Sequence, residues 1–402
     1  MKSPGRPLRI LAIVNLPWDT RLGASRVWIE LGKEWTRAGH TVEKFCLTDA
    51  YPETSSSGAR SALRQALFPR KAAAYVRENA DRFDVIDCLI GVLPFSKDSL
   101  GFSGLVVARS VGLFRLYDRF LHQSRKVWPS QSKGRWFGHF FHRLIAWRSR
   151  SDSEKSIRTC DLLNLPNEDE RRELTMDQAV HVPAIVEPYG LDDEFLEALA
   201  TAAAPAKRRL QGQKICFIGM WGPRKGSREW RQIMAAVWEH HPAAQFLFLG
   251  TMFDETVVRA DLGVDNSTQI FCRPAFAVRD LPLLIADCVM GVFPSHVEGF
   301  GLALLEQLAA GLPTVAYNVP GPRQILRTQS ERLLTPVGDT AAIAARAAEI
   351  LSLSVPDYEK LSAECVAIAQ RYRWPEIANN TITHYRAALD SLGQQPIGAT
   401  RE

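Results

Sequence analysis

The chain has 402 residues, of which 46% are hydrophobic and 23% charged, a length that predicts two domains each large enough to bury a core. The formal net charge of +5 favours an anionic ligand or surface only slightly, and by itself it does not indicate nucleic acid. No apolar stretch approaches the ~18 residues that a membrane span requires, and residues 1–8 are too short and polar for a secretory signal.

The first half of the chain alternates between strand and helix patterns. Residues 9–14 are apolar, as in a buried parallel strand, and a loop containing Gly23 leads to a helix predicted from Ser25 to Ala38. The next strand begins at Thr41, which completes a βαβ unit. We therefore expect an α/β domain over residues 1–195. Further strands are predicted at 85–88, 105–108, 162–165 and 180–182.

A connector precedes a second run of the same pattern. Residues 196–212 are rich in alanine and basic residues, which is typical of a linker. A second α/β domain is expected over 213–372, followed by a helix over 373–392 and a disordered tail over 393–402. Its strands are predicted at 214–219, 245–250, 268–271, 289–293 and 313–317, and a helix is predicted at 227–238. Two such domains imply a crevice in which small ligands commonly bind.

The strongest functional signal is a pair of glutamates, Glu298 and Glu306, at the two ends of the sequence EGFGLALLE. A buried strand precedes them, so Glu298 belongs to a loop at a strand's carboxyl end, where open α/β sheets bind ligands. A helix is predicted from Leu302 to Ala310, which places the N–H groups of Gly299, Phe300 and Gly301 at a helix start suited to anionic or hydroxyl-rich ligands.

The spacing of the two glutamates favours a nucleotide sugar over a glycosidase substrate as the ligand. At ~1.5 Å per residue Glu306 lies roughly 12 Å along the helix from Glu298. Glycosidase carboxyl pairs lie within ~5–10 Å, so the spacing fits the two ends of one extended ligand. The simpler alternative is an acidic turn followed by a helix whose Glu306 is merely solvated.

A second candidate site follows the strand at 214–219. Its sequence GMWGPRKG ends in Arg224, Lys225 and Gly226. Glycines let the chain approach a ligand closely, Lys225 offers a point charge to a diphosphate, and Arg224 offers a planar fork. Fixed cations there would stabilise the negative charge that builds on a departing phosphate. The alternative is an exposed basic turn.

These motifs resemble those of retaining glycosyltransferases with the GT-B fold, in the large family numbered four. The resemblance rests on residues 219–226, 298–306, 321–323 and 336–339, and more loosely, in the first half, on the Gly23 loop and residues 38–42 and 189–192. It implies two Rossmann-like domains that face each other across a cleft. It also implies that the terminal helix crosses back to the first domain.

The resemblance implies roles for individual residues. Glu298 would lie beside the donor sugar as a catalytic residue together with Lys225, and Glu306 would bind the ribose hydroxyls. Arg273 stands where relatives contact the nucleotide base, chiefly through backbone. The remaining donor-binding residues would be Arg224 and the backbone of Gly299, Phe300 and Gly301.

Two positions depart from the family pattern. Met220 stands where relatives usually place an arginine, for which Arg224 is a candidate replacement. Val111 stands where relatives often carry a histidine that faces the donor sugar, so we assign no catalytic base, and Arg109 or Ser110 is a candidate to approach the sugar instead. Gly23 could open space for the acceptor, although a helix start capped by Ser25 explains that loop equally well.

Residues 115–150 contain nine basic side chains against the single acid Asp118, with aromatic residues recurring every fourth position. This pattern predicts an amphipathic helix that can lie on anionic lipid and would suit a lipid-linked acceptor. A core-facing helix with a solvated basic edge produces the same pattern. No nucleic-acid recognition module accompanies these residues.

The seven scattered cysteines are typical of a reduced cytosolic protein, so we expect a cytoplasmic protein. If the helix predicted over 115–150 binds lipid, the protein would be peripheral on the inner face of the membrane.

The sequence thus predicts a retaining glycosyltransferase that moves a hexose-type unit from a UDP-, GDP- or ADP-sugar to a hydroxyl of a saccharide or lipid-linked acceptor. Polysaccharide or glycolipid biosynthesis is the expected setting, with no metal or other cofactor. Met220 and Val111 motivate a first alternative, a catalytically inactive subunit that binds nucleotide sugars. The second alternative is a sugar-nucleotide epimerase of the same fold.

Overall fold

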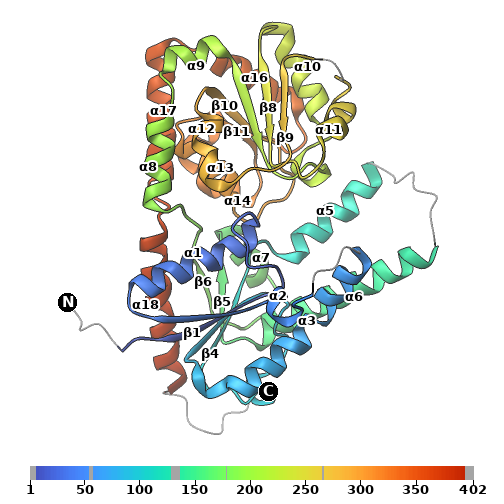
Figure 1. The fold of residues 1–402 in the computed structure, drawn as a ribbon, viewed down its shortest axis with the longest axis vertical. Coiled ribbons are helices and arrows are strands. Elements are labelled where there is room, and N and C mark those ends of the chain that lie inside the picture. Colours follow the sequence, from blue (N-terminus) through green and yellow to red (C-terminus); the bar gives the residue numbers. More distant parts are fainter. Residues whose placement is uncertain (1–5, 54–57, 128–135, 178, 265–266, 394–402) are drawn as a thin grey trace. The chain divides into compact units, whose positions relative to one another are not determined.

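The computed structural model describes residues 6–53, 58–127, 136–177, 179–264 and 267–393 (Figure 1). The chain divides into two compact units, a first unit of Met1–Pro188 with Trp374–Glu402 and a second unit of Tyr189–Arg373. Each unit is built around a six-stranded sheet whose strand pairs are parallel. The predicted α/β class with two Rossmann-like units is therefore confirmed. The tail expected over 393–402 lies outside the described residues except for Gly393, which ends the last helix.

The first sheet has the strand order β2-β1-β3-β4-β5-β6. After β2 the chain crosses to the other side of β1 and forms β3 there, so the topological switch point lies between β1 and β3. Its central strands are mostly apolar because helices cover both faces, and residues 10–14 of β1 are completely buried. The strands are β1 Arg9–Val14, β2 Thr41–Cys46, β3 Val85–Leu89, β4 Leu105–Arg109, β5 Leu162–Leu165 and β6 Ala184–Val186.

The last strand of this sheet is not where the sequence predicts it. The strand predicted at 180–182 is wrong, and β6 begins four residues later, at Ala184, after Pro183. The carbonyl of Pro183 accepts a hydrogen bond from the N–H of Leu163, and β6 then pairs with β5. Instead, the partly buried side chains of Val180 and Val182 pack against the core.

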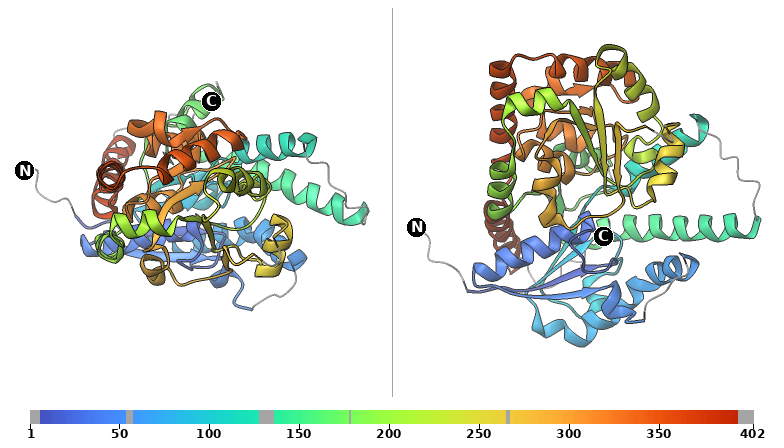
Figure 2. Two further views of the ribbon diagram at one scale, coloured as in Figure 1. Left: turned by 90° about the horizontal axis from the view of Figure 1, so that it is seen from above. Right: turned by 45° about the horizontal axis from the view of Figure 1, so that its top comes forward.

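Helices of the first unit include the terminal one. Helix α18 packs along α1, and the indole N–H of Trp35 donates to the carbonyl of Ala378 at 3.2 Å (Figure 1). Helix α6 extends away from the first sheet (Figure 2). The helices are α1 Gly23–Arg37, α2 Leu47–Ala50, α3 Gly58–Asn79, α4 Lys97–Leu100, α5 Phe114–Val127, α6 Trp136–Thr159, α7 Glu168–Thr175 and α18 Trp374–Gly393, with a 3-10 turn at Ala80–Arg82.

The second sheet has the order β12-β11-β10-β7-β8-β9, the arrangement of dinucleotide-binding sheets. From β7 the chain builds outward through β8 and β9, then returns to the other side of β7 and builds outward through β10, β11 and β12. The topological switch point therefore lies between β7 and β10. The strands are β7 Lys214–Ile218, β8 Gln245–Leu249, β9 Ile270–Arg273, β10 Cys288–Phe293, β11 Thr314–Tyr317 and β12 Leu334–Thr335.

The segment expected to be a linker, 196–212, is mostly helical. Helix α8 starts with Asp192 as its cap and buries Leu196 and Leu199, and α9 buries Arg209, whose guanidinium donates to the carbonyl of Ala286. The alanines that suggested a linker are the best helix formers. The helices are α8 Asp193–Ala202, α9 Ala206–Gly212, α10 Trp230–His240, α11 Glu255–Leu262, α12 Leu281–Ile285, α13 Leu302–Ala309, α14 Pro320–Ile325, α15 Ser330–Leu333, α16 Thr340–Leu351 and α17 Val355–Ala369; 3-10 turns cover Pro223–Lys225, Val278–Asp280 and Arg327–Gln329.

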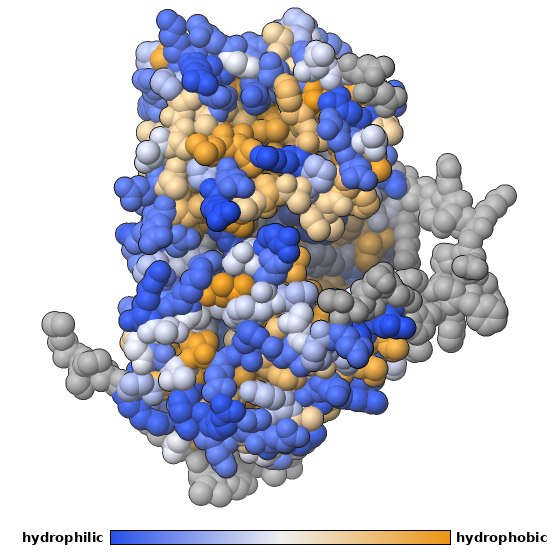
Figure 3. All heavy atoms as spheres, viewed as in Figure 1, coloured by the Kyte–Doolittle hydropathy of each residue, from blue (hydrophilic) through white to orange (hydrophobic). Residues whose placement is uncertain are grey.

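Within the described residues, no helix is both long and apolar enough to cross a bilayer. On the face drawn in Figure 3, hydrophilic and hydrophobic residues are interspersed.

Candidate functional site

The two motifs singled out from the sequence meet at the switch point of the second sheet. Strands β7 and β10 are neighbours, with Cys216 opposite Gly291. The loop after β7 contains residues 219–226, here called the lysine loop, and the loop after β10 contains residues 294–301, here called the glutamate loop. Because the chain leaves the two strands in opposite directions, their carboxyl ends border a crevice that suits a ligand.

An ion pair joins the two loops. The Lys225 ammonium donates to Glu298 Oε2, and the two side chains are only 12% and 13% exposed. The ammonium also lies 4.9 Å from the centre of the Phe293 ring, within the range of a cation–π contact. Burial lowers the pKa of Lys225, and the charge of Glu298 opposes that shift. A cation held in a partly dehydrated place interacts strongly with an anion that enters the crevice.

Arg224 contacts the same carboxylate. Its Nη1 lies 3.8 Å from Glu298 Oε2 and donates to the carbonyl of Val297 at 3.3 Å. The structure thus brings together three of the charged residues that the sequence predicts in the site, Lys225, Arg224 and Glu298. Met220, which replaces the expected arginine, is 50% exposed just after β7.

Glycines allow the loops to pack backbone against backbone. Gly226 has φ of +79°, and a Cβ there would collide with the carbonyl oxygen of Pro294. Gly321, at the start of α14, lies so close to the Phe300 carbonyl that a side chain would not fit. The position of the glutamate loop is therefore fixed by contacts on both sides.

The ring of Phe300 is buried among aromatic side chains. The ring is 2% exposed and packs edge-on against Tyr189 and Tyr372, with centroid distances of 5.4 and 5.6 Å. The role of the backbone of Gly299, Phe300 and Gly301 in holding the ligand stays a prediction.

Glu306 lies in the second turn of α13 and is 5% exposed. The sequence-based separation of roughly 12 Å assumed a helix that runs on from Glu298, and that assumption is wrong. The helix begins at Leu302, after Gly301 adopts φ of +104°. The contact of Glu306 with a ribose stays a prediction.

Arg273 ends the edge strand β9 and is exposed. Its carbonyl accepts from the N–H of Gly250 at 2.9 Å, and the carbonyl of Pro274 accepts from Met252 at 3.0 Å. The backbone at this position is thus tied to the loop after β8, next to the lysine loop, since the N–H of Trp221 donates to the carbonyl of Thr251.

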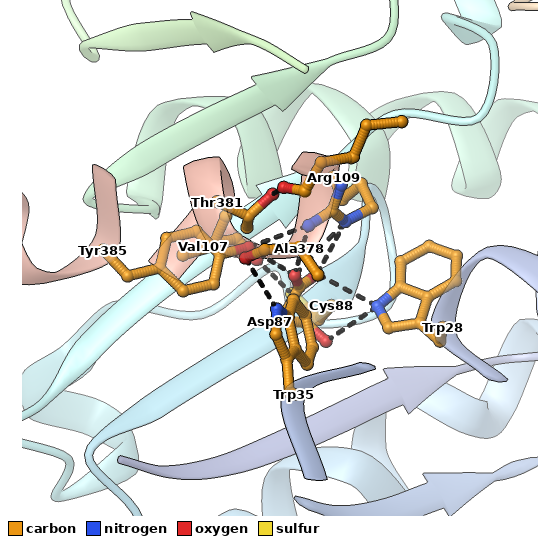
Figure 4. Close-up of polar contacts among 10 residues, drawn as sticks. Trp28, Trp35, Asp87, Cys88, Val107, Arg109, Ala378, Thr381 and Tyr385 are labelled. Atoms are coloured by element: carbon orange, nitrogen blue, oxygen red, sulfur yellow. Dashed lines mark hydrogen bonds and ion pairs between the residues drawn. The ribbon is translucent and has the colours of Figure 1, made fainter. Parts of the chain in front are cut away.

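The structure removes Arg109 from the candidate acceptor contacts. Arg109 is completely buried in the first unit, pairs with Asp87 at 2.7 Å and donates to the Tyr385 hydroxyl at 2.9 Å (Figure 4). Its side chain points toward α18, which the sequence pattern around β4 did not indicate. Ser110 is also buried, and its hydroxyl donates to Glu170 Oε2 at 2.5 Å.

Gly23 remains consistent with open space near an acceptor. It is the first residue of α1, and a Cβ there would have no atom within 4 Å. The alternative that Ser25 caps the helix is wrong, because Leu22 is the N-cap and the Ser25 hydroxyl donates to the carbonyl of Pro17.

Glu170 makes the stability of the first unit depend on pH. Burial raises the pKa of this carboxyl to about 7, although hydrogen bonds from Ser110 and Leu113 oppose the shift. A carboxyl whose pKa is higher in the folded state makes the free energy of unfolding fall as pH rises from about 4.5 to about 7, by at most about 1.4 kcal/mol per pH unit. Glu170→Gln stays neutral and should lose this slope.

Urea unfolding of the wild type and of Glu170→Gln at pH 5 and pH 8 tests this expectation. The variant should gain stability relative to the wild type at pH 8. Glu173→Gln, on the same helix, is the control and should follow the wild type. Parallel pH curves for wild type and Glu170→Gln would contradict the assignment.

The basic segment 115–150 forms two helices, α5 and α6, with the intervening residues outside the description. In the described part its arginines have acidic partners: Arg115 pairs with Glu154 and Asp177, and Arg119 with Glu173. Trp147 is 65% exposed on α6. The side chains of 125–144, which include most of the aromatic repeat, lie outside the described residues.

Sequence reasoning missed one pair in the site, Glu229 and His296. The imidazole Nε2 lies 2.6 Å from Glu229 Oε1. The two residues are 67 positions apart, so no local spacing signals the contact. In the described part of the chain, no three His, Cys, Asp or Glu side chains gather as potential metal ligands.

Comparison with known proteins agrees with this geometry. Residues 212–353 match the family model of Glycosyl transferases group 1. This part of the chain is similar to that family. The matched residues include the lysine loop, the glutamate loop and α13, so the resemblance predicted from these motifs is confirmed.

Similar sequences include two mannosyltransferases. A GDP-mannose:cellobiosyl-diphosphopolyprenol alpha-mannosyltransferase of Xanthomonas campestris is 27% identical over 45% of this chain and 48% of its own length. A phosphatidyl-myo-inositol mannosyltransferase of Mycobacterium leprae is 27% identical over 53% of this chain and 56% of its own length. The chain thus spans about half the length of these relatives.

Solved structures share the fold over nearly the whole chain. Sucrose-phosphate synthase from Thermosynechococcus elongatus has a TM-score of 0.70 and 17% identity, and covers 95% of this chain and all of its own. Anabaena HepE in complex with UDP and glucose has a TM-score of 0.63 and 16% identity, with 94% of this chain and all of its own covered. The chain therefore has the GT-B fold.

Proposed function

We propose that the protein is a retaining glycosyltransferase that moves a hexose-type unit from a nucleoside diphosphate sugar to an acceptor hydroxyl. The observation that carries the proposal is the largely buried Lys225–Glu298 pair at the switch point of the second sheet. It places a cation and a carboxylate at the carboxyl ends of two neighbouring strands, where a ligand with an anionic and a hydroxyl-bearing part can meet both.

In this proposal each group has a defined task. The diphosphate lies against Lys225 and Arg224, and the sugar lies beside Glu298. When the bond between sugar and diphosphate breaks, negative charge grows on the departing phosphate, and the fixed ammonium of Lys225 stabilises it. Because Glu298 already holds Lys225 in place, little reorganisation is needed at that moment. Glu306 binds the ribose, and the backbone near Arg273 borders the base.

The proposed donor is a UDP-, GDP- or ADP-sugar, used without a metal or other cofactor. The proposed acceptor is a saccharide or a lipid-linked saccharide, in polysaccharide or glycolipid biosynthesis. The names of the two mannosyltransferases, which mention a diphosphopolyprenol and a phosphatidylinositol, support a lipid-linked acceptor. A cytoplasmic enzyme that touches the inner face of the membrane through residues 115–150 fits this setting.

A donor panel tests the proposal. The protein is incubated with UDP-, GDP- and ADP-sugars, with and without acceptors and a chelator, and nucleoside diphosphate release and thermal shift are recorded. Release that depends on an acceptor and survives the chelator supports the proposal. Stabilisation without release under any acceptor favours a binding subunit, and conversion of the sugar nucleotide itself favours an epimerase.

Alanine at the two glutamates should separate their roles. Glu298→Ala should lower nucleoside diphosphate release by about 10²-fold or more, because the group beside the reacting sugar is lost, while nucleotide binding partly survives. Glu306→Ala should weaken nucleotide binding by about tenfold through loss of a charged hydrogen-bond partner. Release kinetics and calorimetric binding of the nucleoside diphosphate provide the two measurements.

The exposed Glu331 on α15 supplies a matched control, since Glu331→Ala removes a carboxylate elsewhere in the same unit. It should leave both quantities unchanged. The reverse pattern, with Glu306→Ala blocking release and Glu298→Ala weakening only binding, would refute the assigned roles.

A further inference from the structure

Two ionisable residues without a task in the proposed reaction connect the loops of the site. His296 Nε2 lies 2.6 Å from Glu229 Oε1, and the two side chains are 11% and 8% exposed. Because an ionised carboxylate only accepts, the imidazole is the donor. The backbone N–H of His296 also donates to the carbonyl of Arg224 at 2.8 Å. His296 is therefore bonded to residues on both sides of Lys225.

Both residues are fixed to the sheet. Glu229 immediately precedes α10, and its N–H donates to the carbonyl of Gly226 at 3.2 Å. The next residue, Trp230, is completely buried against Phe248, with a centroid distance of 4.9 Å. The ring of Tyr317, on β11, packs edge-on against His296 at 5.4 Å. The pair thus lies in the interior of the second unit, behind the two loops.

Stability alone does not account for a pair in this place. Taking a carboxylate and an imidazole out of water is costly, and well-packed apolar residues of similar size are often as stabilising. What apolar residues lack is a bond of fixed length and direction. Here that bond joins Glu229, four positions after Lys225, to His296, two positions before Glu298. It therefore acts on the distance between the Lys225 and Glu298 side chains.

We propose that His296 and Glu229 are positioning residues that hold the glutamate loop in register with the lysine loop. They act through Glu298 and Lys225 and do not touch the donor. The inference rests on the proposed function of the site and adds to it the device that sets the geometry of the charged pair. Gly226 and Pro294 keep the loops in contact without the pair, so its loss shifts the loops and does not separate them. A displacement of about 1 Å is enough to lower a rate by as much as 10²-fold.

Variants at the pair separate positioning from stability. His296→Leu leaves the Glu229 carboxylate buried without its partner and should lower both the melting temperature and the rate of donor turnover. The double variant Glu229→Leu with His296→Leu replaces both partners and should melt within a few degrees of the wild type. Its turnover should nevertheless stay about 10- to 100-fold low, because the directional bond is missing. His296→Gln retains an amide donor toward Glu229 and should keep turnover within about threefold of the wild type.

A matched control removes a buried hydrogen bond of the same unit that lies outside the two loops. Tyr358, on α17, donates its hydroxyl to the carbonyl of Val289, and Tyr358→Phe should lower the melting temperature without changing turnover. A double leucine variant with full turnover would overturn the proposal, as would a glutamine variant that is no more active than His296→Leu.

Hydrogen exchange followed by mass spectrometry reads the coupling without any substrate. In Glu229→Leu, peptides that cover residues 294–301 should exchange faster, although the substitution lies in the other loop. Unchanged exchange there would overturn the proposal even if turnover falls. If the wild type released no nucleoside diphosphate from any donor, the proposed function would fail, and the exchange result alone would decide the positioning role.

Discussion

Replacing Lys225 by methionine should lower the rate of nucleoside diphosphate release by about 10²- to 10³-fold. Methionine keeps an unbranched side chain one atom shorter than that of lysine, but it provides no charge for the departing phosphate. The ammonium is partly dehydrated and held by Glu298, so solvent does not replace it well. Release kinetics at saturating donor measure the effect on turnover.

The pH dependence of release gives a second measure of the same group. Burial lowers the pKa of Lys225, so the wild type should lose activity on the alkaline side below the usual lysine value of about 10.4. Lys225→Arg keeps its charge at every accessible pH, so its alkaline loss of activity should shift to higher pH. Its activity should be lower than that of the wild type because the guanidinium has a different geometry. Lys360→Met, which removes an exposed lysine of the same unit, should behave like the wild type.

Thermal unfolding must accompany these measurements, because Lys225→Met leaves Glu298 buried beside Arg224 alone. A variant that is folded and binds nucleotide but does not release it would agree with the assigned role. Full turnover in folded Lys225→Met would show that a group other than Lys225 stabilises the charge on the departing phosphate.

The sequence predicted the elements that carry this site because their signals are local. Residues 288–293 and 214–218 are short apolar runs bounded by loop residues, which is typical of buried parallel strands. Glu298 and Lys225 each follow such a strand within a few positions. Knowing that both loops sit at carboxyl ends of parallel strands is enough to expect them at one edge of the sheet.

The features that sequence reasoning missed depend on contacts between distant positions. Asp87 and Tyr385 are 298 residues apart, and neither has a neighbour that marks it as part of a buried cluster. The sequence makes Arg109 a candidate for the crevice because it lies two positions before Val111, where relatives often carry a histidine. Only the packing of α18 against the sheet shows that its partners lie inside.

A buried charged cluster ties the terminal helix to the first sheet. Asp87 on β3 accepts hydrogen bonds from Arg109 on β4, from the Tyr385 hydroxyl on α18 and, at 2.9 Å, from the indole N–H of Trp28 on α1 (Figure 4). Arg109 and Asp87 have no exposed side-chain surface. Each residue of this cluster forms a hydrogen bond with a residue of another element, so the cluster holds four elements of the first unit together.

Arg109→Met should therefore destabilise the first unit by about 3–5 kcal/mol, because it leaves the Asp87 carboxylate buried without its cation. Native-state hydrogen exchange of the β3 and β4 amides measures this unit separately from the second one. Tyr385→Phe removes one hydrogen bond to Asp87 and should cost about 1–3 kcal/mol.

The double variant Asp87→Leu with Arg109→Met decides between a cost of unpaired charge and a cost of lost packing. With both charges gone, most of the stability should return, since no buried ion is left without a partner. A double variant as unstable as Arg109→Met would show that packing around the methionine, and not the unpaired carboxylate, is responsible. In that case α18 would be held to the sheet mainly by its apolar face, through Trp374, Ile377 and Ile382, and the charged cluster would contribute little.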